Sequence, residues 1–471
     1  MDIETVKKLI QDYEPGHMDF VQKALIGERY YRNKTDILFK DNKDDDKDPE
    51  GNPLRNADNR IPRNFHGLLV NQKAAYAFTE PPTFDTGSQS TNDRVVKILG
   101  DDYRKNCMTL CVDSANTGVA WIHYWRDKDG KFDWAVCPPT DVIPVFDGSL
   151  KQKMIGALRE YHRIDDATGD RYIVYEIWND VACESYERKE ADTVDFLLPC
   201  YSFVDPLTGE PTNTFEHGLG TVPFIPFWNN NTHSDDLENI KGLIDVYDKV
   251  FSGFINDLDD VQQLIFVISG YGGQNLKEFL QDLKKYKAIN IDNDEDHPGD
   301  VKTLSIEIPI EARNSVLDAT RKAIFEQGFG FDPRPENFGN QSGVALKFMY
   351  APLEMKTGLM EVEFQSAFNK FVRAICDFYN LNCGRINQTW TRTAIQNDLE
   401  QAQICQASVG IVSNKTILRN HPFVSDADAE EKQIKAEKEE SQQDYGFLGD
   451  SAKNTAATEG NDPADEGGEQ K

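Results

Sequence analysis

The stretch Ser342–Tyr379 constrains the fold of this chain more than any other, because its apolar residues recur at the period of an α-helix. The steps between them are three, four or seven residues, which places them on one face: Leu346, Met349, Leu353, Met360, Phe364, Phe368, Phe371, Ile375 and Phe378. The step of seven contains Lys356 and Thr357, a polar interruption of the apolar face. Such a helix would be roughly 57 Å long. It is either a long core helix or a spine that connects several parts of the protein.

A proline lies within this stretch. Pro352 has no backbone N–H to donate, and its ring crowds the carbonyl four residues earlier, so we predict a kink in the helix there. Ser342 has a side chain suited to cap the start of the helix. The sequence therefore predicts a long helix that begins near Ser342 and bends at Pro352.

The composition limits the class of protein. With 80 acidic and 51 basic residues, the chain has a formal net charge of −29, which argues against a broad basic surface for nucleic acid. A length of 471 residues is typical of about three domains. The charged N-terminus does not resemble a signal peptide, and no apolar run approaches the roughly 20 residues that span a membrane. We therefore expect a soluble protein, made in a reducing compartment, with no membrane partner.

The first half of the chain alternates between helix and strand patterns. Helical periodicity predicts helices over 1–40, 64–77 and 95–117. Runs rich in β-branched and aromatic residues predict strands, the first two of which form a hairpin: 119–125, 132–138, 157–164, 171–178, 181–188 and 193–199. The sequence therefore predicts an α+β fold with an antiparallel sheet.

The second half is dominated by helices. Two amphipathic helices, 238–263 and 310–327, are predicted to lie antiparallel and to flank a small αβ module, 264–308. A loop rich in Gly, Pro and Asn, 328–341, precedes the long helix, and a strand is predicted over 385–395. Further helices are predicted at 396–412, 413–420 and 426–440 before a polar acidic tail that we expect to be disordered.

Motifs for catalysis are absent from the sequence. It contains no Walker A motif, no His-Glu-x-x-His and no Gly-x-Ser-x-Gly, and its eight cysteines include no Cys-x-x-Cys pair. Asp257, Asp259 and Asp260 could form the metal site of a hydrolase, but on a helix Asp257 and Asp259 point to different sides. A solvated acidic face is the favoured interpretation, and we predict no catalytic residue, metal site or cofactor.

The order of these elements resembles the portal, or head-to-tail connector, protein of tailed bacteriophages, in particular its siphophage-type branch. Six segments spread over nearly the whole chain carry this resemblance in the family's order: ERYYRNKTDIL (28–38), NRIPRNFHGLLVNQKAAYAFTEPP (59–82), HGLGTVPFIPFWNN (217–230), ENIKGLIDVYDKVFSGFINDL (238–258), SGVALKFMYAPLEMK (342–356) and SNKTILRNHPFVSDADAEE (413–431). The region 159–216 is assigned from its pattern alone.

The resemblance implies a portal-type subunit with named parts. These are a wing of sheet and helices, a two-helix stem, a small αβ clip, a tunnel loop, a kinked spine helix, a return strand to the wing, a helical crown and a disordered tail. The implied ranges are 1–237 for the wing, 238–263 and 309–331 for the stem, 264–308 for the clip, 332–341 for the tunnel loop, 342–380 for the spine, 381–395 for the return strand, 396–440 for the crown and 441–471 for the tail.

The resemblance also implies a structural function. The chain is expected to form a closed ring of twelve subunits at one capsid vertex, the channel for double-stranded DNA during packaging and ejection. Its expected partners are the terminase large subunit, the head-completion adaptor protein, and the major capsid and scaffolding proteins. The ring would be assembled in the host bacterial cytoplasm and remain in the virion. Another virion or scaffold adaptor, and a metal-dependent hydrolase that uses the aspartate cluster, are the alternative hypotheses.

Three groups of residues are predicted to carry this function. The tip of the tunnel loop would grip or seal DNA and consists of Asn337, Phe338, Gly339, Asn340 and Gln341. Carboxylates that repel phosphates would line the channel and let DNA slide: Asp245, Asp248, Asp257, Asp259 and Asp260. The clip would present a partner surface formed by Asn293, Asp294, Glu295 and Asp296.

Overall fold

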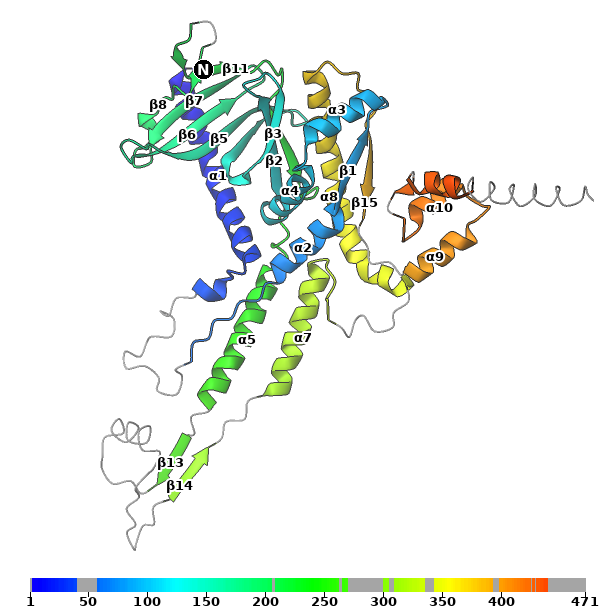
Figure 1. Cartoon of the computed structure of the whole chain (residues 1–471). Coiled ribbons are helices and arrows are strands. Elements are labelled where there is room, and N and C mark those ends of the chain that lie inside the picture. Colours follow the sequence, from blue (N-terminus) through cyan, green and yellow to red (C-terminus); the bar gives the residue numbers. More distant parts are fainter. Residues whose placement is uncertain are drawn as a thin grey trace, which may run out of the picture. The chain divides into compact units, whose positions relative to one another are not determined.

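The computed structural model describes residues 2–39, 57–205, 208–261, 265–269, 300–304, 309–334, 343–392, 398–424, 426–427 and 429–438. They belong to two compact units. The first comprises Met1–Gly339 and Met349–Ala394, and the second comprises Asn340–Phe348 and Ile395–Lys471. The first unit contains both sheet and helical layers (Figure 1), which confirms the predicted α+β class.

Helix α1 (Ile3–Tyr31) begins at Asp2, whose carboxylate accepts hydrogen bonds from the backbone N–H groups of Glu4 and Thr5. It is followed by the short helix η1 (Asp36–Phe39). The N-terminal part of α1 packs on one face of a large antiparallel sheet through Val6 and Ile10, both fully buried. The predicted helix over 1–40 is thus confirmed, with an end at Tyr31.

The large sheet has the strand order β11-β7-β6-β5-β4, with β8 paired to β7. All pairs are antiparallel, as the sequence predicted. The strands are β4 (Val142–Phe146), β5 (Met154–Ile164), β6 (Arg171–Trp178), β7 (Ala182–Lys189), β8 (Leu198–Pro199) and β11 (Thr214–Glu216). The prediction of a strand over 193–199 is wrong for most of this range. Val194–Phe196 form a 3₁₀ turn, η4, and only Leu198–Pro199 pair with β7 as the short strand β8. The minor strands β9 (Phe203–Val204) and β10 (Pro211–Thr212) pair with each other.

A second sheet, β12-β2-β3, forms the main core with helices from both halves of the chain. Its strands are β2 (Val119–Arg126), β3 (Phe132–Cys137) and β12 (Phe224–Trp228). Helix α8 (Gly343–Phe378) buries three phenylalanines of its predicted apolar face against this core: Phe364, Phe368 and Phe371. The predicted long helix is confirmed, and Pro352 lies within it, whereas the kink at Pro352 stays a prediction.

One stretch predicted to be a single helix is two helices in the structure. The range 95–117 belongs to two helices, α3 (Gln89–Leu99) and α4 (Tyr103–Thr117). Gly100 ends α3 with a φ of +72°, a conformation that glycine adopts without steric strain. Helix α2 (Phe65–Phe78) is largely buried and contributes to three separate clusters of the core. Strand β1 (Glu80–Asp85) follows it and pairs with β15 (Asn387–Thr391), the predicted return strand.

Helices α5 (Lys241–Val261) and α7 (Ile310–Gln327) form the predicted antiparallel pair (Figure 1). At one end, Ile244 of α5 shares a core cluster with Ile324 and Phe325 of α7. At the other end, Arg313 of α7 forms an ion pair with Asp257 of α5. Strands β13 (Ile265–Ser269) and β14 (Asp300–Leu304) pair with each other, while residues 270–299 of the predicted αβ module lie outside the described residues.

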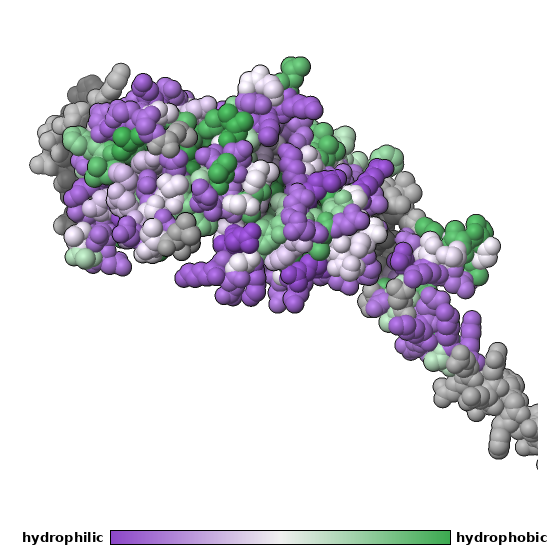
Figure 2. All heavy atoms as spheres, turned by 90° about the horizontal axis from the view of Figure 1, so that it is seen from above, coloured by the Kyte–Doolittle hydropathy of each residue, from purple (hydrophilic) through white to green (hydrophobic). Residues whose placement is uncertain are grey.

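The second unit contains α9 (Asp398–Ala407), α10 (Asn414–Asn420) and a helical segment at 429–438. The side chain of Ser413 caps α10 by accepting a hydrogen bond from the N–H of Thr416. Hydrophilic residues cover most of the molecular face in Figure 2, with hydrophobic residues in small groups among them. In the described part of the chain, no helix is both long enough and apolar enough to cross a membrane.

Candidate functional site

Side chains of α5 hold an extended segment, residues 57–63, which we call the strap. Every second N–H of the strap donates to a side chain one helical turn further along α5: Arg63 to Asp248 at 3.0 Å, Ile61 to Ser252 at 3.0 Å, and Asn59 to Asn256 at 2.6 Å. Two residues of extended chain advance about 6.6 Å and four residues of helix about 6 Å, so the two repeats match. The strap therefore fixes the position of α5 against the rest of the first unit.

These contacts change the interpretation of the predicted acidic lining. Asp248 is fully buried and also accepts a hydrogen bond from the hydroxyl of Thr35 at 2.6 Å, so it is not a channel-lining residue. Burial raises the pKa of Asp248 to about 6, because the charged form loses water. The sequence could not reveal this role, because the strap and its hydrogen-bond acceptors on α5 are far apart in the chain and meet only in the folded structure.

The remaining aspartates of α5 differ in their surroundings. Asp245 accepts hydrogen bonds from the hydroxyl of Tyr30 and from Lys241, and Asp257 is paired with Arg313. Asp259 is exposed and accepts a hydrogen bond from the side-chain amide of Asn59 at 2.7 Å. The side chain of Asp260 lies outside the described residues. Among the described residues, no three His, Cys, Asp or Glu side chains lie close enough together to hold a metal ion.

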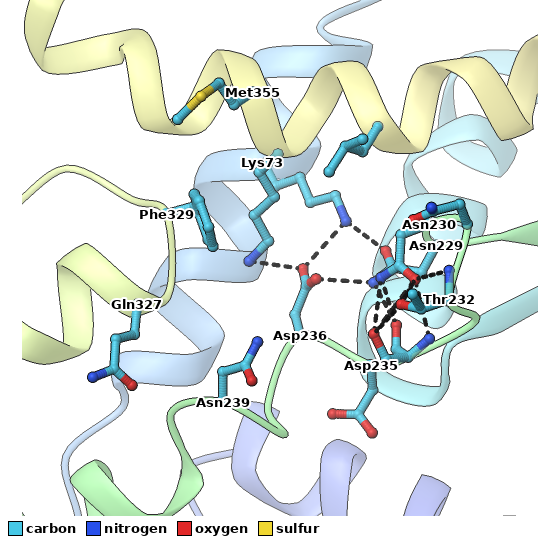
Figure 3. Close-up of a pocket in the computed structure, with 14 residues that line it drawn as sticks. Lys73, Asn229, Asn230, Thr232, Asp235, Asp236, Asn239, Gln327, Phe329 and Met355 are labelled. Atoms are coloured by element: carbon cyan, nitrogen blue, oxygen red, sulfur yellow. Dashed lines mark hydrogen bonds and ion pairs between the residues drawn. The ribbon is translucent and has the colours of Figure 1, made fainter.

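A buried charge cluster lies where α2, α8 and the segment before α5 meet (Figure 3). The carboxylate of Asp236 is 3.2 Å from the ammonium group of Lys73 and 3.0 Å from that of Lys356, and it accepts a hydrogen bond from the amide of Asn229 at 2.9 Å. The exposed fractions of the Lys73, Lys356 and Asp236 side chains are 1%, 11% and 6%. Two buried lysines therefore share one carboxylate.

Electrostatics in this cluster follow from burial and charge pairing. Burial alone would raise the pKa of Asp236, but the two ammonium groups hold it well below its ordinary value. Burial lowers the pKa of Lys356, and Asp236 opposes that shift. The nearby His66 is neutral near pH 7, because burial lowers its pKa to about 4. Lys356 also donates to the carbonyl of Gly328 at 3.0 Å, so the cluster connects α8 to the end of α7 as well.

The cluster lines a pocket of about 200 Å³. The polar wall of the pocket comes from the segment that follows β12, and its apolar rim comes from Phe329, Met355 and Leu359. Sequence analysis did not identify this site. The signal was present in the interruption at Lys356 and Thr357, since a lysine on the apolar face of a core helix requires a buried partner for its charge.

The start of the predicted tunnel loop is held firmly by its neighbours. The carboxylate of Asp332 accepts hydrogen bonds from Arg321 at 2.8 and 2.6 Å and from Arg334 at 2.8 Å. The Gln72 side chain of α2 donates to the carbonyl of Phe331 at 2.8 Å and accepts from its N–H at 3.3 Å. The predicted tip residues, 337–341, and the predicted clip surface, 293–296, lie outside the described residues.

Comparison with known proteins identifies the family of this fold. The family model described as "Phage portal protein, SPP1 Gp6-like" matches residues 10–444, so the chain belongs to this family of phage portal proteins. The portal protein of Clostridium phage phiCD119 is 37% identical over 93% of this chain and 96% of its own length. The portal protein of Bacillus phage SPP1 is 29% identical over 93% of this chain and 86% of its own length.

A solved structure is also similar to this chain. It is described as the neck of a native GTA particle computed with C12 symmetry, and it shares 10% sequence identity over 75% of this chain and 88% of that chain. The TM-score is 0.39. The predicted membership of the siphophage-type portal family is confirmed by the family match and by the two portal relatives.

Proposed function

We propose that this chain is the subunit of a closed ring of twelve copies at one vertex of a phage capsid, through which double-stranded DNA passes during packaging and ejection. The observation that carries the proposal is the portal-family match over residues 10–444. A closed ring requires two different, complementary surfaces on each subunit, so that every copy contacts two neighbours. We propose a structural role for the ring, without catalysis.

The antiparallel pair α5–α7 supports the proposed assignment of stem and clip. Strand β13 follows α5 in the chain and β14 precedes α7, and the two strands pair with each other, as a clip between two stem helices would require. We propose that this clip binds the terminase large subunit during packaging and the head-completion adaptor protein afterwards, with residues 293–296 in the contact. The major capsid and scaffolding proteins are proposed partners of the ring during assembly, and the virion is its final location.

The proposed channel lining now depends on fewer aspartates than the sequence suggested. Asp248 is buried, and Asp245 and Asp257 have cationic partners in the same chain. Asp259 keeps an exposed carboxylate on α5 and is the proposed lining residue among those with described side chains. A lining without free cations would let DNA slide, because phosphates would find no fixed counter-charge.

The proposed DNA gate is the tip of the tunnel loop, residues 337–341. Support comes from the base of the loop, where Arg321 and Arg334 both form ion pairs with Asp332. The side chain of Gln72 also hydrogen-bonds to the backbone N–H and carbonyl of Phe331. A fixed base transmits force from the loop to α2 and α7. The polar tip residues could offer hydrogen bonds to phosphates without a fixed charge.

Electron microscopy of the purified full-length protein tests the proposal. We expect rings with a central hole, and light scattering should give a mass that is a multiple of the subunit mass. A protein that remains monomeric at all concentrations and salt conditions would refute the ring. A magnesium-dependent nuclease activity, absent from an Asp257→Asn variant, would refute the purely structural role.

A further inference from the structure

The chain reverses direction where α8 ends. The backbone N–H of Leu381 bonds to the carbonyl of Cys376 at 2.8 Å, and Asn380, the residue before the donor, has a φ of 52°. These are the marks of a Schellman motif, whose left-handed position asparagine tolerates. The segment after the motif therefore packs back against α8, and both Leu381 and Cys383 contact the core cluster that contains Cys376.

This reversal brings two cysteines from different elements together. Cys376 belongs to the last turn of α8 and is fully buried, whereas Cys383 follows the reversal and is partly exposed. Both are free thiols. The Cys383 thiol lies beside that of Cys376, and burial together with this neighbour raises the pKa of the Cys376 thiol to about 12. The two side chains thus form a dithiol with one buried and one accessible member.

A second pair of cysteines provides a comparison. Cys107 and Cys111 lie one turn apart on α4, and both are fully buried. A reagent in solution reaches neither of these thiols while the protein is folded, because neither side chain is exposed. Their shared helix also fixes their backbone positions, whereas Cys383 lies in a segment without regular secondary structure and can adjust to the geometry of a disulfide.

We propose that Cys376 and Cys383 are a modification site at which a low-molecular-weight disulfide from the surroundings, such as oxidised glutathione, produces an intrachain disulfide. The thiolate of Cys383 attacks the external disulfide, releases one thiol and becomes a mixed disulfide. The thiolate of Cys376 then attacks Sγ of Cys383 and releases the second thiol. One S–S bond breaks and another forms: the two cysteines are oxidised, and the external disulfide is reduced to two thiols, which take up the two protons.

The chemistry of the pair separates folding from later oxidation. At neutral pH little of the Cys376 thiol is ionised, and a reducing cytoplasm reverses a mixed disulfide, so the chain folds with both thiols free. Outside such a compartment the bond would tie the end of α8 to the segment that leads into β15. A crosslink of this kind stabilises the fold by restricting the unfolded chain. This inference goes beyond the proposed function and does not depend on the ring.

Peptide mapping tests the proposal directly, because trypsin cleaves after Arg373 and Arg385 and releases both cysteines in one peptide, Ala374–Arg385. The folded full-length protein is incubated with oxidised glutathione, then unfolded in an alkylating reagent and digested. We expect this peptide to lose two hydrogens, about 2 Da, and to take up no alkyl group. The reaction should be faster at pH 9 than at pH 7, since only the thiolate attacks. The peptide Asn106–Arg126 carries Cys107 and Cys111 in the same digest and should remain fully alkylated, as the matched control.

The oxidised wild type should also unfold at a temperature about 3–5 °C higher than the reduced protein. Cys383→Ser removes the accessible thiol and leaves the buried Cys376 in place, so the oxidant should not change its unfolding temperature. A mixed disulfide on Cys383 that never closes would overturn the proposal, and so would a peptide that stays fully alkylated. Equal oxidation of Cys107 and Cys111, or a disulfide between two chains, would overturn it as well.

Discussion

Replacing Asp236 by asparagine removes the one carboxylate that two buried lysines share. The side chain keeps its shape, but Lys73 and Lys356 lose their counter-charge at exposed fractions of 1% and 11%. Removing one partner of a buried ion pair costs about 3–5 kcal/mol of stability. Because 1 kcal/mol corresponds to about 2–4 °C in a domain of 150–250 residues, we expect the unfolding temperature to fall by about 10 °C. Differential scanning calorimetry of the full-length protein measures this shift.

Asp129→Asn provides the matched control. Asp129 pairs with Lys131 at 3.3 Å, but the two side chains are 73% and 67% exposed, so the pair contributes at most about 1 kcal/mol. Since the pKa of Asp236 is held well below its ordinary value, its stabilisation is complete above about pH 5 and is lost as the pH falls further. The difference between wild type and Asp236→Asn should therefore be constant from pH 6 to 8 and shrink in acid.

A second substitution tests the sharing of the carboxylate. Lys356→Met leaves the pair of Lys73 and Asp236 intact, so it should destabilise the protein less than Asp236→Asn does. The double variant should lose less stability than the sum of the two single variants, because the methionine removes a charge that would otherwise be unpaired. A shift for Asp236→Asn no larger than that for Asp129→Asn would refute the reasoning.

Three further predictions concern the strap, the loop and the clip. The pKa of Asp248 is raised to about 6, so ionisation of this buried carboxyl destabilises the folded state as the pH rises from about 4 to 6. Over that interval, the free energy of unfolding of Asp248→Asn should increase by up to about 3 kcal/mol relative to that of the wild type. Parallel pH profiles of the unfolding free energy would contradict this. Replacing 337–341 with a Gly/Ser linker should leave rings intact and reduce DNA packaging or retention, and normal packaging would exclude the loop as a gate. Substitutions within 293–300 should impair terminase or adaptor docking in a pull-down with intact rings; unchanged docking would place the partner surface elsewhere.

The sequence by itself determined the elements whose pattern is local. A period of 3.6 residues identified α5, α7 and α8, and the bounds predicted for α7 are those observed. Strands β2, β3, β5, β6 and β7 were identified by their composition and by the turns between them. The family was evident from six segments in a fixed order, because such an order is a property of the chain and not of its folding.

Tertiary structure decided which residues meet. Lys73, Asp236 and Lys356 come together from distant parts of the chain, and no local pattern records that pairing. The helical pattern predicted that Asp248 lies on a solvated face of α5, but in the structure the strap packs over it and buries it. The burial of a side chain depends on what packs over it, which a local pattern does not show. The range 95–117 looked like one helix because periodicity carries across a break, which Gly100 introduces through its backbone conformation.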